Sequence, residues 1–180
     1  STFSGRNSNV GVEIKPTIEE EGKCKAKEQT GDTWEVQMAF TNPMKAKGWG
    51  PFLYDIAMEY VTSLGGRLMA DRGSVEQDAK NVWDFYLSKK RDDVKPAQLD
   101  DLDGPFTTPK DDTDDCIHYS FKDRYFSKAD RDMFFKNSEK DKKEFTDSSL
   151  TKSYVKTGGQ PIIDQLTDLG KIVFSRGLKK

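Results

Sequence analysis

The chain has 180 residues, of which 34% are hydrophobic and 33% charged, and its formal net charge at pH 7 is −2. This length suits one domain, or one domain with an appendage. The low apolar share predicts a small core with long polar excursions. The aromatic content of 11% argues against wholesale disorder, and the small net charge gives no reason to expect a membrane or nucleic-acid partner.

No apolar segment resembling a signal peptide lies near Ser1, and no apolar run reaches the length of a membrane span. We therefore expect a protein made in a cytoplasm. The two cysteines, Cys24 and Cys116, lie far apart and form no CxxC motif. They are expected to be free, buried thiols.

The N-terminal part predicts a flexible arm followed by short strands. Residues 1–9 are rich in Ser, Asn and Gly, whereas residues 10–15 alternate apolar and polar side chains and residues 22–28 do so more weakly. The best predicted strand covers 33–40. Its expected apolar face consists of Trp34, Val36, Met38 and Phe40.

Two helices and a strand are predicted next. Pro51 stands where a first helical residue is favoured, apolar residues then recur at helical spacing up to Leu64, and Gly65-Gly66 ends the pattern. Residues 67–71 predict a short buried strand. Ser74 is the expected cap of a helix over about 75–88.

The remaining sequence is less patterned. Residues 89–115 are acidic and interrupted by proline and glycine, which predicts a long loop, and 116–121 alternate like a strand. A charged helix is expected over 129–135, followed by a linker to about residue 150. The last predicted helix opens at Pro161. Its apolar stripe is Ile162, Ile163, Leu166, Leu169 and Val173.

The segment Lys45-Ala46-Lys47-Gly48-Trp49-Gly50 links the best strand to the proline-started helix. A glycine-containing loop that enters a helix offers backbone N–H groups and the positive end of the helix dipole to a phosphate. Gly48 and Gly50 would let phosphate oxygens approach the backbone closely. A strand that diverges from its neighbour before such a loop could expose amides to a thioester carbonyl.

This pattern resembles the Arg/Gln-x-x-Gly-x-Gly/Ala signature of GNAT acetyltransferases, with Lys45 in place of the usual first residue. Residues 79–83 resemble the family's downstream Ala-x-x-Leu-Tyr helix, and the resemblance covers about residues 33–87. It implies acetyl-CoA as the cofactor and no tightly bound metal. The residues that it places at the cofactor are Phe40, Lys45, Ala46, Lys47, Gly48, Trp49, Gly50 and Asn81.

The resemblance also implies catalytic roles. Glu35, on the best strand, would be the general base, although it could also be a plain exposed carboxylate. Trp83 stands where the family often has a tyrosine acting as general acid, so Tyr86 is the nearest substitute, with a place in the core as its alternative. His118 is expected to be hydrogen-bonded or exposed. The acidic run 111–115 lacks the spacing of a calcium loop.

The predicted fold is therefore α+β, with a GNAT-like mixed central sheet flanked by helices and a long polar or helical C-terminal extension. Residues 1–91 would form the acyl-CoA-binding core, and 92–180 would contact protein partners or further copies of the chain. The expected activity is acetyl transfer from acetyl-CoA to an amine. The alternative is a GNAT-derived structural or interaction protein that has lost catalysis, such as a component of a phage particle.

Overall fold

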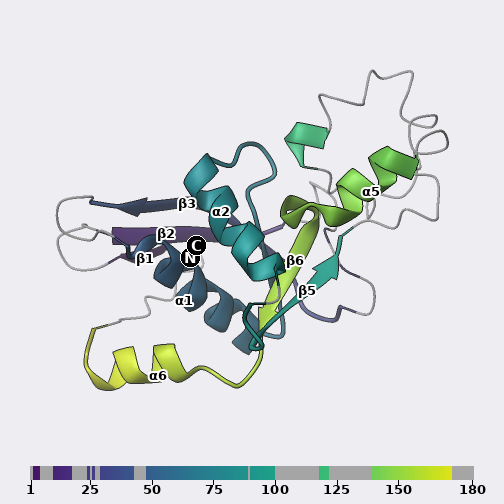
Figure 1. The fold of residues 1–180 in the computed structure, drawn as a ribbon. Helices are drawn as coiled ribbons and strands as arrows, with labels where there is room; N and C mark the ends of the chain where they lie inside the picture. The colour runs from purple at the N-terminus through teal and green to yellow at the C-terminus, as the bar shows by residue number, and fades with distance from the viewer. Residues whose placement is uncertain are drawn as a thin grey trace.

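A computed structural model describes residues 2–4, 10–17, 24, 26, 29–42, 48–88, 90–99, 118–121 and 139–171, with the backbone alone for 2–4, 141 and 142. The described strands form one six-stranded sheet in the order β1-β2-β3-β4-β6-β5 (Figure 1). They are β1 Thr2–Ser4, β2 Val10–Pro16, β3 Thr33–Thr41, β4 Arg67–Met69, β5 Val94–Gln98 and β6 Lys152–Lys156. The helices are α1 Gly50–Ser63, α2 Gln77–Leu87, α5 Glu139–Asp147 and α6 Pro161–Asp168, with the 3-10 turn η3 at Ser149–Thr151. The predicted α+β class and mixed sheet are confirmed.

The pairing of β3 with β4 is parallel, whereas the other neighbouring strands run antiparallel. Parallel neighbours need a crossover, and α1 provides it. The α1 helix follows the pattern read from its sequence. It begins around Pro51 and ends in a turn in which Gly65 has φ 73° and the Gly66 N–H donates to the Val61 carbonyl.

A β-bulge reverses the faces of β3 half-way along its length. Glu13 pairs with Met38 and Ile14 pairs with Val36, so Gln37 is the extra residue. Beyond it, Ala39 packs on the core, and Met38 and Phe40 are 57% and 38% exposed. The prediction that Met38 and Phe40 share the buried face of Trp34 and Val36 is therefore wrong, because one inserted residue shifts the alternation.

The C-terminal part joins the sheet and does not extend from it. The β5 strand lies within the predicted loop 89–115, and β6 lies between β4 and β5. Strands on both sides of residue 91 thus belong to one sheet, and the described residues show no boundary there. The described segment also contains α5, where a linker was expected.

Several local predictions differ in detail. Residues 2–4 form a strand where a flexible arm was expected, and residues 119–121 are helical where a strand was expected. The α2 helix begins after Glu76 without a side-chain cap, so Ser74 is not the cap that was expected. The Ser74 N–H donates to Asp71 in the preceding turn. Most of the predicted strand 22–28, the helix 129–135 and Val173 lie outside the described residues.

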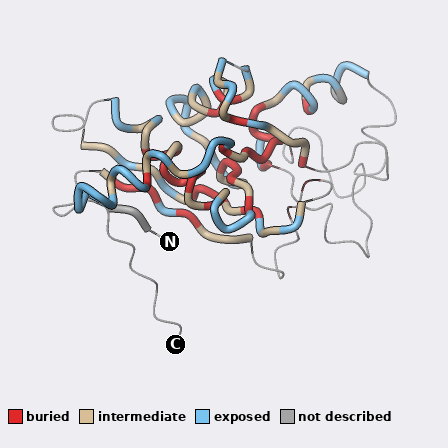
Figure 2. Tube along the Cα trace, turned by 90° about the horizontal axis from the view of Figure 1, so that it is seen from below, coloured by how far each residue is buried: buried red, intermediate tan, exposed pale blue. Residues whose placement is uncertain are grey.

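Buried residues run through the sheet and the sides of the helices that face it (Figure 2). Trp83 lies at the centre, stacked on Tyr154 of β6 with ring centroids 5.2 Å apart. Cys24 is disulfide-bonded, contrary to the expectation of free thiols, and Cys116 lies outside the described residues. None of the described helices has the length and apolar character needed to cross a membrane.

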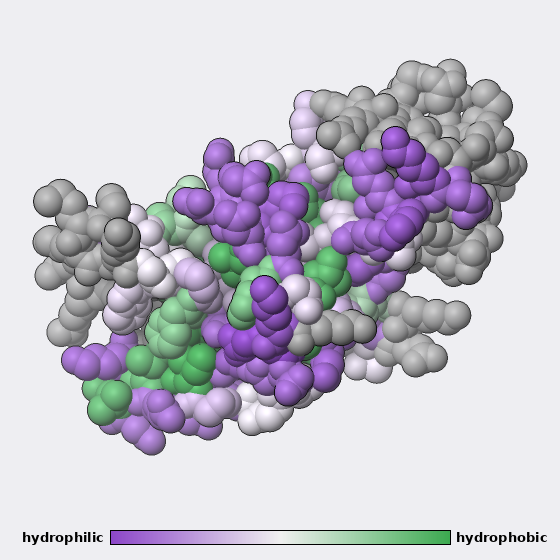
Figure 3. All heavy atoms as spheres, viewed as in Figure 1, coloured by the Kyte–Doolittle hydropathy of each residue, from purple (hydrophilic) through white to green (hydrophobic). Residues whose placement is uncertain are grey.

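The α6 helix is attached through a buried ion pair. Glu59 of α1 accepts hydrogen bonds from the Lys156 ammonium at 2.7 Å and from the amides of Ile162 and Ile163 at 3.1 and 3.0 Å. The apolar stripe of α6 is only partly covered by other residues: Ile163 is buried, whereas Leu169 is 68% exposed. Figure 3 shows apolar side chains gathered at this end of the molecule.

Candidate functional site

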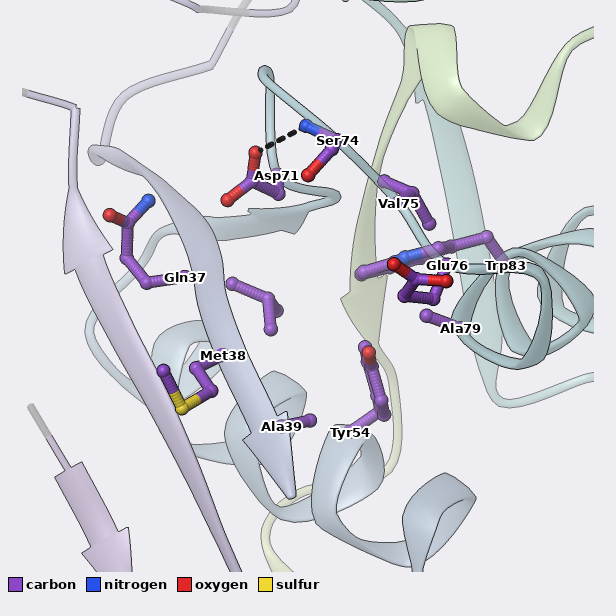
Figure 4. A pocket seen from close by; sticks show the side chains of 11 residues that line it. Gln37, Met38, Ala39, Tyr54, Asp71, Ser74, Val75, Glu76, Ala79 and Trp83 are labelled. Atoms are coloured by element: carbon purple, nitrogen blue, oxygen red, sulfur yellow. Dashed lines mark hydrogen bonds between the residues drawn. The ribbon is translucent and has the colours of Figure 1, made fainter.

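A cleft opens where β3 and β4 diverge. Their pairing covers only Thr33–Glu35 and Arg67–Met69, so β3 continues past Glu35 without β4 beside it. A cavity of about 230 Å³ lies there, between β3, α1 and the beginning of α2 (Figure 4). It is lined by Val36, Gln37, Met38, Ala39, Tyr54, Asp71, Ser74, Val75, Glu76, Ala79 and Trp83. The β4 strand ends at Met69, and the exposure of β3 amides to a thioester carbonyl stays a prediction.

The N-terminus of α1 lies next to this cleft. It has no acidic residue in its first turn and no side-chain cap. Within the part of the chain that the structure describes, the Gly50 and Phe52 amides have no hydrogen-bond acceptor. Tyr54, which lines the cavity, follows Gly50 by four residues, or about 6 Å along the helix axis. A bound group could therefore reach from the helix end into the cavity.

The two glycines of the loop, Gly48 and Gly50, differ in backbone conformation. Gly48 has φ +85°, a conformation that favours glycine, whereas no positive φ is recorded for Gly50. A Cβ at Gly50 would meet no atom within 4 Å. The packing of the chain thus gives no reason for glycine at position 50, while close approach of a ligand would.

The other residues predicted to bind the cofactor do not all lie at the cleft or at the start of α1. Trp49 is 48% exposed at the start of α1 and packs edge-on against Phe52, with ring centroids 5.5 Å apart. Asn81 is exposed, accepts a hydrogen bond from Gln77 and does not line the cavity. Phe40 also lies outside the lining. Lys45, Ala46 and Lys47 lie outside the described residues.

Glu35 is buried beside the cleft and is not the exposed carboxylate that was the alternative reading. One of its oxygens accepts the Arg72 backbone N–H, and the other lies 3.8 Å from the Lys15 ammonium. Burial raises the pKa of Glu35, and the nearby Asp71 charge adds to this effect. Glu35 does not line the cavity itself, but its neighbour Val36 does.

Tyr86 is not brought to the cleft. Its side chain is buried, and its hydroxyl donates to the Asp55 carboxylate at 2.9 Å. Asp55 in turn accepts from Arg91, also at 2.9 Å. Burial and the Asp55 charge raise the pKa of Tyr86. The hydroxyl is thus engaged in a network that joins α1, α2 and the start of β5.

Tyr54 and Asp71 reach the cleft instead, and sequence reasoning missed both. Tyr54 is 6% exposed, and Figure 4 shows its hydroxyl directed from α1 into the space between β3 and α2. Burial, followed by the Asp71 charge, raises the pKa of Tyr54 to about 12. One Asp71 oxygen accepts the Gly73 and Ser74 amides at 2.6 and 3.0 Å. The available signals were a polar residue at the end of a strand and a tyrosine one turn past the glycine loop.

Comparison of the chain with known proteins finds no matching family model, curated protein or solved structure. Among the described residues, no group of three or more His, Cys, Asp or Glu side chains could hold a metal ion.

Proposed function

We propose that the chain binds acyl-CoA in the manner of GNAT acetyltransferases and transfers an acetyl group from acetyl-CoA to an amine. The observation that carries the proposal is the cleft where β3 leaves β4, one helical turn from the uncapped start of α1. The pyrophosphate of acetyl-CoA lies between its adenosine and its pantetheine arm, and the thioester ends that arm. A helix N-terminus can bind the first group, and a free strand edge can bind the second.

Different residues along the cleft bind different parts of acetyl-CoA. The Gly50 and Phe52 amides bind the pyrophosphate, and the β3 backbone past Glu35 binds the thioester carbonyl. The neutral amine attacks that carbonyl carbon and gives one proton to the Asp71 carboxylate, because Asp71 lines the cavity and Glu35 does not. The thiolate of coenzyme A leaves and is protonated by Tyr54, which takes the role first assigned to Tyr86, because only Tyr54 lines the cavity.

A catalytically inactive binding or structural protein is the second candidate. The observation that favours it is the engagement of the Tyr86 hydroxyl with Asp55, because the phenol nearest to the family's usual acid position is unavailable. The first candidate requires the cleft to bind acetyl-CoA, whereas a structural protein does not. Only the first predicts the formation of acetylated amine in a single-turnover assay with acetyl-CoA.

Calorimetric titration with acetyl-CoA tests whether the chain binds the cofactor. Wild type should bind, and Gly50→Glu should abolish binding because it adds bulk and negative charge where phosphate approaches. Gly50→Ala should keep the free energy of unfolding and weaken binding by roughly tenfold. Ser63→Glu, which adds the same charge at the other end of α1, is the matched control. No heat from wild type at millimolar acetyl-CoA would overturn the proposal.

A further inference from the structure

The polar residues of the cleft carry acceptors and no cation. Among its eleven lining residues, Asp71 and Glu76 are acidic, Gln37 and Ser74 are neutral and polar, and none is Lys or Arg. The Arg72 guanidinium donates to the Ala70 and Leu150 carbonyls, and the Lys15 ammonium lies 3.8 Å from Glu35. Among the described lining residues, the charged side chains are thus Asp71 and Glu76, and both are acidic.

A second observation shows that the cavity is suited to a polar ligand. The Tyr54 side chain is more than nine-tenths buried and points into the cavity (Figure 4), and no hydrogen bond of its hydroxyl is recorded in the described structure. The Tyr54 hydroxyl is therefore free to form a hydrogen bond with a ligand in the cavity. Asp71 likewise uses one carboxylate oxygen for the Gly73 and Ser74 amides and has its other oxygen available.

The apolar side chains that line the cavity limit the shape of a ligand. Val36, Val75, Ala79 and the ring of Trp83 form an apolar surface next to these polar groups. A volume of about 230 Å³ suits a slender carbon chain. A primary ammonium group carries three donors, and an aromatic face attracts it when it lies close. Acceptors beside an apolar wall thus match an ammonium group on an unbranched alkyl chain.

We infer that the cleft contains a binding site for a primary alkylammonium group, with Asp71 as its counter-ion and Trp83 against its carbon chain. The inference rests on the proposed function in one respect, since the bound ammonium, once it has lost a proton to water, would be the amine that accepts the acetyl group. It assigns the contact with the acceptor to Asp71, whereas Glu35 lies behind the lining. Binding of the ammonium itself does not require acetyl-CoA.

The test is a titration of the ¹⁵N-labelled full chain with n-butylammonium chloride in the absence of coenzyme. The Trp83 indole N–H signal should shift with saturation. n-Butanol has nearly the same shape without the charge, and it should bind at least roughly tenfold more weakly. Equal binding of the alcohol would show a merely apolar pocket and would overturn the inference, without the need for any variant.

Variants locate the site. Asp71→Asn keeps an oxygen that can accept the Gly73 and Ser74 amides, so its melting temperature should stay close to wild type while butylammonium affinity falls at least roughly tenfold. Asp78→Asn removes an exposed charge of α2 outside the lining and should change affinity less than twofold. Unchanged affinity in folded Asp71→Asn would overturn the inference. Butylammonium binding without acetyl-CoA binding would leave this site standing and remove the proposed function.

Discussion

At the scale of single residues, the position of a tyrosine hydroxyl decides its role. Tyr54 and Tyr86 both lie on the buried faces of helices, and their pKa values are both raised by burial. Only Tyr54 lines the cleft, whereas Tyr86 is bound to Asp55. Helical spacing predicts which residues are buried, but it cannot show which buried hydroxyl faces a cavity.

The two tyrosines should therefore respond differently to loss of the hydroxyl. Tyr54→Phe should lower the rate of acetyl transfer by roughly 100-fold, as for loss of a general acid. Tyr86→Phe should leave the rate nearly unchanged and reduce the free energy of unfolding by about 1 kcal/mol, because it removes one buried hydrogen bond. Steady-state rates and urea unfolding of both variants give the comparison. The opposite pattern would return the acid role to Tyr86.

His118 should make stability depend on pH. Burial, followed by the Arg72 charge, lowers the pKa of His118 to about 4, and its Nε2 has no hydrogen-bond partner. In the unfolded chain the pKa returns to about 6.5, so the unfolded state binds the proton first as pH falls. The contribution of neutral His118 is complete above pH of about 6.5 and is lost between there and about 4.

The expected loss by pH 4 is about 3 kcal/mol, because each pH unit between the two pKa values contributes about 1.4 kcal/mol. Urea unfolding of wild type and of His118→Gln, measured from pH 7 down to pH 4, isolates this term, because glutamine does not titrate. The difference between the two proteins should change by this amount over the range. Parallel pH profiles would show that His118 titrates alike in both states.

At the scale of elements, α1, α2 and β2 could be predicted from periodicity, because each buries one face of a regular pattern. The position of β3 could be predicted in the same way, but the bulge at Gln37, which exposes Met38 and Phe40, could not. The β6 strand could not be predicted. Its residues Lys152, Ser153 and Lys156 are buried, which depends on partners such as Gln98, Arg67 and Glu59 that lie far away in the sequence. The β5 strand contains Pro96 and lies at the sheet edge, the position where proline is tolerated.

The Glu59–Lys156 pair should hold three elements together, since it joins α1, β6 and α6. Glu59→Ala would leave a buried ammonium unpaired and two helix amides without their acceptor, at a cost of about 3–5 kcal/mol in the free energy of unfolding. The double variant Glu59→Met/Lys156→Met should recover a large part of that loss. Denaturant unfolding of the three proteins is the measurement, and a loss below 1 kcal/mol for Glu59→Ala would contradict it.

At the scale of the whole molecule, the sheet unites the two halves of the chain. A fragment of residues 1–91 lacks β5 and β6, and with them Tyr154, which stacks on Trp83. It should show no cooperative unfolding by circular dichroism. A fragment of residues 1–157 keeps all six strands and should unfold cooperatively, with reduced stability because it lacks α6. A cooperatively folded 1–91 fragment would restore the boundary that the sequence suggested.

The proposed function requires acyl-CoA to bind along the start of α1 and in the cleft between β3, α1 and α2. Titration of the ¹⁵N-labelled chain with acetyl-CoA tests it most directly, because every assigned amide reports separately. We expect saturable chemical-shift changes at the amides of Gly48, Gly50 and Phe52, at residues 36–39 of β3 and at the Trp83 indole. Shifts confined to other surfaces, or no shift at millimolar acetyl-CoA, would contradict it.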